Sequence, residues 1–213
     1  MNGLHSARSG RSKLNFTVTD LEGHFFGYRG RLVDHFENIA KTLLEREGYW
    51  VIQSFKINLS PAQKAQIHPS KSSIPRPEID LLALHVPTST IIAFEVKSFF
   101  DSVGVKLVDV AADHLVPEGR YKLFTCAPYR DIVLHQLRTD LLALGLMGPA
   151  FQIRLGLIAG NGRKADIEAM RHHFAERNWE FWGPGDVKAR VQRFANEGYC
   201  NDPAVITAKI LQR

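Results

Sequence analysis

The chain has 213 residues, of which 45% are hydrophobic and 23% are charged. This balance is typical of a folded globular protein, and the length suits one domain with a well-buried core, so wholesale disorder is excluded. No apolar run is long enough to span a bilayer, and no membrane partner is expected. The net charge of +5 weakly favours a polyanionic partner.

The N-terminus and the cysteines bear on location. Residues 1–15 contain arginine and lysine but no apolar stretch of the kind found in a secretory signal, which predicts a flexible basic arm. The two cysteines, Cys126 and Cys200, are too few for a disulfide framework and lack the spacing of a structural zinc site. A reducing, cytoplasmic compartment is therefore expected.

The first half of the chain predicts one helix followed by three strands. Apolar residues at helical spacing predict a helix over residues 28–47, and a strand follows at 49–57. Residues 58–75 are rich in proline and serine and predict a loop with one helical turn after Pro61. Two apolar strands, at 78–86 and 90–98, then form a hairpin.

The second half of the chain predicts shorter elements. In chain order they are a helix at 105–114, a strand at 121–127, a helix at 128–146, a strand at 151–160, a helix at 164–177, a strand at 179–183, a helix at 186–196 and a last helix after Asp202. The alternation of helices and strands predicts an α/β fold with a central mixed β-sheet flanked by helices. Residues 16–213 are expected to form this single domain, with its core over about 28–182 and C-terminal helices over 184–213.

The hairpin carries charges inside apolar runs, in the sequence RPEIDLLALHVPTSTIIAFEVKS (residues 76–98). A two-residue turn would pair Asp80 with Lys97 and place Glu95 diagonally on the same face. The apolar neighbours predict strands covered on both faces, where an unpaired charge is costly. Two carboxylates with one lysine suit a hard dication such as Mg²⁺.

This hairpin resembles the PD-(D/E)XK nuclease superfamily, in which an acid on one strand precedes a (D/E)-x-K triplet on the next. The matching segments are PEID (residues 77–80) and EVK (residues 95–97), and the preceding order of one helix and three strands also fits. The resemblance implies a restriction-endonuclease-like core. It further implies an acid from the first helix, for which Glu37 is the candidate.

The resemblance implies a metal-dependent endonuclease that hydrolyses phosphodiester bonds in DNA. Asp80, Glu95 and the Val96 carbonyl would hold Mg²⁺, for which Mn²⁺ could substitute. Lys97 would hold the attacking water and offset charge at the phosphorus, and Glu37 would position that water or a second metal. The alternative without function is a cross-strand ion pair between Asp80 and Lys97, with Glu37 an ordinary helix-surface acid.

A polyanionic substrate should leave a basic footprint, and the stretch between Glu47 and Glu78 contains no acid. Its candidate DNA-binding residues are Lys56, Lys64, Lys71 and Arg76. The loop over residues 58–75 is expected to flank the site and to be poorly ordered without DNA. Gln136, on the helix after the motif, is a weaker candidate.

Three functions stay open from the sequence. The first is an endonuclease of the restriction, repair or phage-defence type. The second is a structure-specific junction resolvase or transposon-end nuclease, and the third is a non-catalytic nucleic-acid-binding module on the same fold. The glycine turn AGNGRK lacks the P-loop pattern, so no nucleotide cofactor is expected. Cutting both strands with one site per chain would favour a homodimer.

Overall fold

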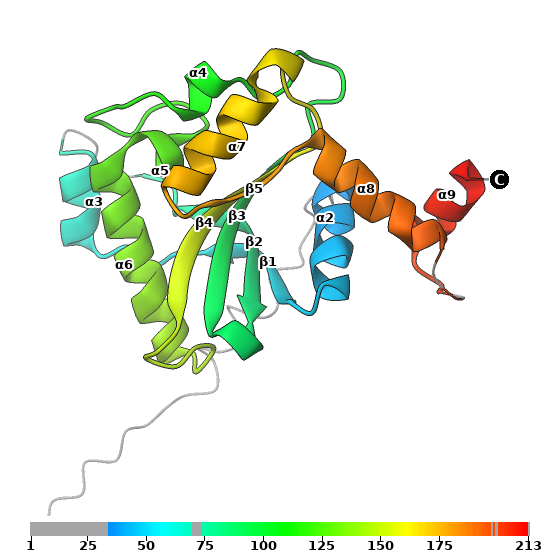
Figure 1. Ribbon diagram of the computed structural model, residues 1–213. Coiled ribbons are helices and arrows are strands. Elements are labelled where there is room, and N and C mark those ends of the chain that lie inside the picture. The colour runs from blue at the N-terminus through cyan, green and yellow to red at the C-terminus, as the bar shows by residue number, and fades with distance from the viewer. Residues whose placement is uncertain (1–33, 70–73, 197, 199, 213) are drawn as a thin grey trace, which may run out of the picture. The chain divides into compact units, whose positions relative to one another are not determined.

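A computed structural model describes residues 34–69, 74–196, 198 and 200–212, except for the side chain of Leu211. The expected N-terminal arm and the first residues of the predicted first helix lie outside this range. The described part forms one α/β domain around a five-stranded mixed sheet with the strand order β1-β2-β3-β4-β5 (Figure 1). The α/β class and the mixed sheet are thereby confirmed.

The sheet has an antiparallel half and a parallel half. Strands β1 (Trp50–Lys56), β2 (Glu78–His85) and β3 (Thr90–Lys97) form an antiparallel meander. Strands β4 (Gln152–Ala159) and β5 (Glu180–Trp182) continue the sheet parallel to β3. Strand β3 therefore lies in the centre, at the junction of the two halves.

Helices cover both faces of the sheet. The α-helices in the described part are α2 (His35–Arg46), α3 (Pro61–Ile67), α4 (Leu107–Val110), α5 (Lys122–Thr125), α6 (Ala127–Ala143), α7 (Ile167–Glu176), α8 (Pro184–Ala195) and α9 (Pro203–Leu211). Helices α6 and α7 lie on one side of the sheet, and α2 and α8 lie on the other (Figure 1). Among the described residues, none of the helices has the length and apolarity needed to cross a bilayer.

Strand β3 shows how the sequence builds the two cores. Ile91 and Ala93 face the core that contains α6 and α7, whereas Ile92 and Phe94 face the core that contains α2 and α8. Successive side chains of a strand point to opposite faces, so a continuous apolar run is buried twice. The expectation that the hairpin is covered on both faces is confirmed.

The segment that we expected to be an irregular loop contains helix α3. The Ser60 hydroxyl accepts a hydrogen bond from the Gln63 amide, and the Gln63 side chain accepts one from the Ser60 amide. This reciprocal capping box, with Pro61 in the first turn, begins a helix within a proline-rich stretch. The helix begins at Pro61, where one helical turn was predicted, but it continues to Ile67 and is longer than that turn.

The predicted strand at residues 121–127 was also wrong, because α5 and the start of α6 occupy it. The amides of Thr125 and Cys126 donate to the carbonyls of Tyr121 and Lys122, which closes one helical turn. Tyr121 and Leu123 are buried and Lys122 is exposed, so these three side chains alternate as they would in a strand, whereas Phe124 and Thr125 are buried as well. In a single helical turn, two-residue alternation does not distinguish the two structures.

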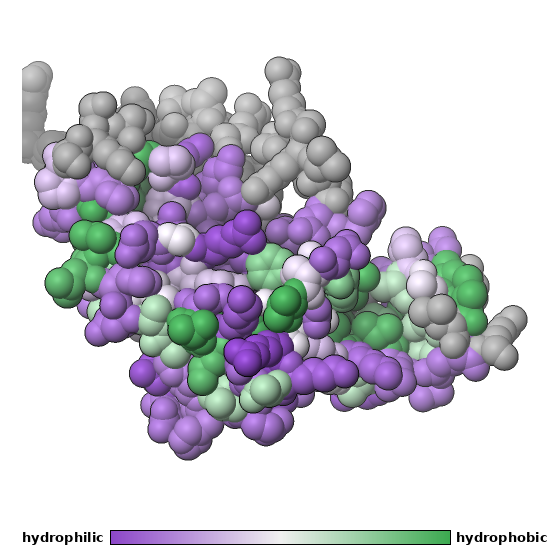
Figure 2. Space-filling model, turned by 90° about the horizontal axis from the view of Figure 1, so that it is seen from above, coloured by the Kyte–Doolittle hydropathy of each residue, from purple (hydrophilic) through white to green (hydrophobic). Residues whose placement is uncertain are grey.

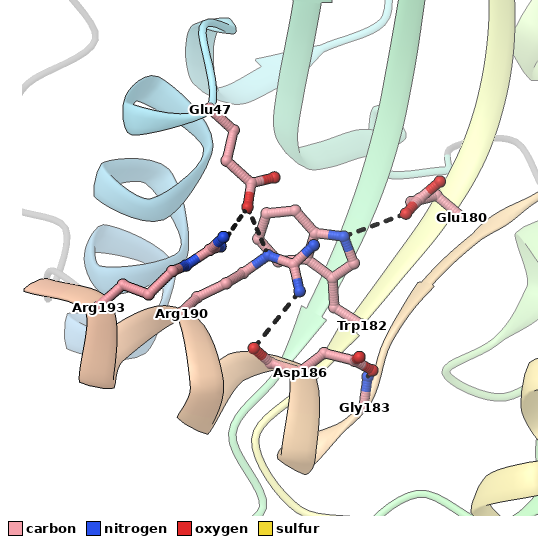
Figure 3. A network of polar contacts seen from close by, with 7 residues as sticks. All are labelled: Glu47, Glu180, Trp182, Gly183, Asp186, Arg190 and Arg193. Carbon is pink, nitrogen blue, oxygen red and sulfur yellow. Dashed lines mark hydrogen bonds and ion pairs between the residues drawn. The ribbon is translucent and has the colours of Figure 1, made fainter.

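A polar cluster joins α2 to α8 across the C-terminal end of α2 (Figure 3). Glu47 Oε1 accepts hydrogen bonds from Arg190 Nε at 2.8 Å and from Arg193 Nη2 at 2.9 Å. The Arg190 guanidinium also stacks over the Trp182 ring, with its central carbon 3.8 Å from the ring centroid. We call these four residues the Glu47 cluster, and it fixes two helices that are far apart in the sequence.

Candidate active site

The β2–β3 hairpin closes through a turn that is longer than the sequence predicts. A 3₁₀ turn over Val86–Thr88 is followed by Ser89 in the left-handed conformation, with a φ of 48°. His85 therefore pairs with Thr90, and the register is shifted by two residues from the predicted pairing of 87 with 90. Continued along the strands, this register places Asp80 opposite Glu95 rather than Lys97. An even shift keeps every side chain on its predicted face.

The structure brings Asp80, Glu95 and Lys97 together on the face covered by α6 and α7. Lys97 Nζ lies 2.5 Å from Glu95 Oε1 and 3.4 Å from Asp80 Oδ2. The same nitrogen donates a hydrogen bond of 3.1 Å to the Val96 carbonyl. Three oxygens from two strands therefore converge on one cationic group. We call Asp80, Glu95 and Lys97 the Asp80 cluster.

The Asp80 carboxylate is held where the two strands part. The last paired residues of β2 and β3 are Leu81 and Phe94, and beyond them the Val96 amide donates to Asp80 Oδ2 at 2.8 Å. On the other side, the β1–β2 register places Ser54 beside Asp80, and Ser54 has a φ of 56°. A non-glycine residue in this region carries backbone strain, and such strain concentrates at functional sites.

Burial and charge shift the acid and the base in the same direction. The pKa of Glu95 is raised, first because burial disfavours its charge and then because Asp80 repels it, and Lys97 offsets only part of this. Burial alone would lower the pKa of Lys97, but the attraction of the two carboxylates outweighs it, so that pKa is raised. With both acids ionised, the cluster has a net charge of −1. A second cation would relieve the repulsion that remains.

Tyrosine and lysine side chains that the sequence did not single out border the cluster. Burial, and secondarily the Glu95 charge, raises the pKa of Tyr129, and burial raises the pKa of Tyr121 to about 12, so both keep their protons. The Lys122 amine lies 5.1 Å above the Tyr129 ring, and its charge helps to lower the pKa of Glu95. Lys122 and Tyr129 line a hollow of about 290 Å³ together with His68. Sequence reasoning missed Lys122 because it assigned this segment to a strand.

Glu37 and Gln136 lie on α2 and α6, which cover opposite faces of the sheet. Glu37 is half-buried in the first turn of α2, which packs on the opposite face of the sheet. The Gln136 amide donates to Asp140 Oδ1 at 2.7 Å, and its oxygen accepts from Gln63 at 2.9 Å, so it ties α3 to α6. Their catalytic roles stay predictions.

The four basic residues predicted to bind DNA are spread along the segment before the hairpin. Lys56 ends β1, and Arg76 is exposed and donates to Asn58 Oδ1 at 3.0 Å. Lys64 is half-buried on α3, and Lys71 lies outside the described residues. Pro75 and Pro77 line the same hollow as Lys122, so the end of this segment flanks the cluster.

The donor set fits a small hard cation. No group of three or more histidine, cysteine, aspartate or glutamate side chains within the described ranges could hold a metal. Two carboxylates and the Val96 carbonyl do converge, however, and Mg²⁺ is commonly bound through one or two carboxylates with water at its other positions. The residues present therefore fit Mg²⁺ better than a metal that needs an all-protein cage.

No family model matches the chain, and no curated protein or solved structure matches it either. The function of the chain is therefore inferred from the geometry and electrostatics of the Asp80 cluster.

Proposed function

We propose that the protein is a metal-dependent nuclease that hydrolyses phosphodiester bonds in DNA. The observation that carries this proposal is the convergence of Asp80 Oδ2, Glu95 Oε1 and the Val96 carbonyl on one cation, the Lys97 ammonium. A cross-strand ion pair needs one acid, and a second acid beside it costs free energy unless another cation is bound.

Each residue of the cluster has a role in this reaction. Asp80, Glu95 and the Val96 carbonyl would hold Mg²⁺ or Mn²⁺, which neutralises charge on the phosphate and makes a bound water more acidic. Lys97 would turn its ammonium from the carboxylates towards the substrate. There its N–H groups would donate to a phosphate oxygen and orient the attacking water.

The surroundings support a nucleic-acid substrate. Lys122 holds a positive charge beside Glu95 without contacting the proposed ligand oxygens, which suits a phosphate next to the scissile one. Lys56 and Arg76 are exposed on segments that lead to the cluster. The net charge of +5 adds a long-range attraction for a polyanion.

The direct test is to incubate the purified protein with supercoiled and linear DNA in Mg²⁺ or in EDTA. We expect conversion of the supercoiled form in Mg²⁺ and none in EDTA. DNA binding without cleavage under every metal condition would instead support a non-catalytic binding module, and neither binding nor cleavage would refute both.

A further inference from the structure

Phe100 is an exposed aromatic side chain three residues beyond Lys97. Its exposed fraction is 63%, although the ring lies against two other residues. The Phe36 and Phe100 rings pack edge to face, at 5.3 Å between centroids and 85° between planes. Gly160 lies next to the tip of the Phe100 ring, where an added Cβ would come within 2.8 Å of Cζ. The glycine thus provides the space that the ring occupies.

The backbone around Phe100 is fixed rather than loose. Phe99 has a φ of 49°, which a bulky residue rarely adopts, and it packs partly against the core while its neighbour points outward. The Asn161 side-chain amide donates to the carbonyls of Phe99 at 3.2 Å and Ser102 at 2.7 Å. The chain therefore tolerates strain to hold an apolar ring at the surface in one place.

This ring is within reach of the proposed cleavage site. Two residues separate it from Lys97, so the two Cα atoms are at most about 11 Å apart along an extended chain. The Gly160 amide, under the ring, donates to the Lys97 carbonyl at 2.8 Å. Phe100 thus lies at the carboxyl end of β3, where the Asp80 cluster also lies, although the two project from different faces of the sheet.

The surface beyond Phe100 continues with apolar side chains. Val103 and Val108 are also exposed, and both line a hollow of about 680 Å³ together with Phe99, Arg120 and Tyr121. Figure 2 views the end of the molecule that carries α4 and shows hydrophobic side chains standing among hydrophilic ones. In a duplex the faces of the bases are covered by their neighbours, so apolar protein surface of this kind can meet them only where the bases are unstacked.

We infer that Phe100 stacks on an unpaired base next to the scissile phosphate, and that the substrate is single-stranded or locally unpaired DNA. This inference rests on the proposed function and names its substrate class. Stacking on an aromatic side chain is sequence-tolerant, because every base has a flat face. The hollow beside Phe99 would take the base that follows.

The test compares exposed aromatic residues at the two ends of the sheet. Trp50 is 75% exposed and pairs with Leu84, at the end opposite the Asp80 cluster, so it is the matched control. All proteins carry Asp80→Asn so that bound DNA is not cut. Affinities are measured for a single-stranded oligonucleotide and for a blunt duplex of the same length, and melting curves verify folding.

We expect Phe100→Ala to weaken single-strand binding by about 5- to 150-fold, the range that one aromatic stack provides, and duplex binding by less. Phe100→Trp should restore binding, and Trp50→Ala should leave both affinities unchanged. In proteins that retain Asp80, Phe100→Ala should slow cleavage of the single strand more than of the duplex.

Equal effects on both DNAs, or no effect on the single strand, would overturn this inference while leaving a cleaving protein a nuclease. A change in self-association measured by light scattering, with DNA affinity unchanged, would assign Phe100 to a protein interface and overturn it too. If the parent protein neither binds nor cuts DNA, the proposed function itself fails.

Discussion

The Asp80 cluster and the Glu47 cluster lie on opposite faces of the same sheet and have opposite charge balances. In the Glu47 cluster, two arginines share one carboxylate, and one of them also covers the Trp182 ring. In the Asp80 cluster, two carboxylates share one lysine, and all three side chains are only 16–19% exposed. In the Glu47 cluster the positive charges outnumber the single negative charge. In the Asp80 cluster one of the two negative charges has no positive charge to balance it.

The difference distinguishes a structural contact from a candidate functional site. The partners of Glu47 come from α8, more than 140 residues away in the sequence, so the cluster holds distant elements together. The Asp80 cluster comes from two strands that backbone hydrogen bonds already join, so it adds little to the fold. Charge kept in a place where it does not stabilise the fold is a mark of function.

The largest expected difference between the clusters is in catalysis. Asp80→Asn removes a proposed ligand charge and Lys97→Ala removes the amine, and each should reduce the rate of DNA cleavage by at least about 100-fold. Glu47→Gln, a substitution of the same kind on the other face, should cleave within a few-fold of the wild-type rate. Gel-based cleavage rates under saturating Mg²⁺ measure all three. Comparable losses in all of them would mean that the assay reports folding rather than chemistry.

The second difference is in the response of stability to metal. Asp80→Asn should raise the melting temperature without Mg²⁺, because it removes repulsion from Glu95, and it should abolish further stabilisation by the ion. The wild type should gain about 2.7 kcal/mol at a Mg²⁺ concentration 100 times the dissociation constant.

Glu47→Gln should destabilise the protein and keep its response to Mg²⁺, in contrast to Asp80→Asn. It leaves two arginines without their carboxylate and should lose about 1–2 kcal/mol of unfolding free energy, with the response to Mg²⁺ retained. Melting curves of the three proteins with and without Mg²⁺ decide the matter before any substrate is known. A wild type indifferent to Mg²⁺, and destabilised by Asp80→Asn, would identify the Asp80 cluster as a plain ion pair.

The sequence predicted one cluster and could not have predicted the other. The acids and the lysine of the hairpin lie within 18 residues, and the two-residue period of a strand determines their common face. The predicted register was wrong by two residues, because the turn contains a 3₁₀ segment and a left-handed Ser89 that the letters PTST do not specify. That error left the face intact, since the shift was even.

Other features depended on contacts that no local pattern contains. Ser60 and Gln63 have the spacing of a capping box, so the start of α3 could have been predicted from the sequence. The surrounding prolines and serines favoured a loop instead. Lys122, by contrast, lies in the four-residue helix α5, which is too short for its apolar pattern to distinguish a helix from a strand. The pairing of Arg190 with Glu47 depends on how α2 and α8 pack.

The stability of the folded protein should depend on pH because the pKa of Glu95 is raised. Just above the ordinary pKa of glutamate, the unfolded chain releases the Glu95 proton while the folded protein keeps it. The folded state then binds more protons, so its stability falls as pH rises between the unfolded and the folded pKa. The loss is about 1.4 kcal/mol for each unit between the two values.

Urea unfolding at several pH values without metal measures this slope. Glu95→Gln should be less sensitive to pH across that window than the wild type, whereas Glu47→Gln should keep the wild-type slope. Mg²⁺ should reduce the fall in stability of the wild type, because it favours the ionised carboxylate. A Glu95→Gln protein with an unchanged slope would show that this carboxyl is not the group that holds the proton.

The smallest expected effect on stability comes from a buried nitrogen outside both clusters that has no hydrogen-bond partner in the described part of the chain. Within the described residues, His173 Nε2 is buried and has no hydrogen-bond partner, and the ring packs edge-on against Phe174 and Trp179. Burial, and then the charge of Arg177, lowers the pKa of His173. Below the ordinary pKa of histidine the unfolded chain therefore binds the proton more readily, and stability falls as pH drops towards the folded value.

Replacing His173 with phenylalanine removes an unsatisfied polar group that has no proposed role. His173→Phe should be neutral or slightly stabilising at pH 8 and more stabilising relative to wild type near pH 5, with cleavage unchanged. Paired unfolding curves at the two pH values measure the gain. A group that takes part in the function cannot be replaced without loss of activity. A loss of cleavage in His173→Phe would therefore assign this histidine to the functional site.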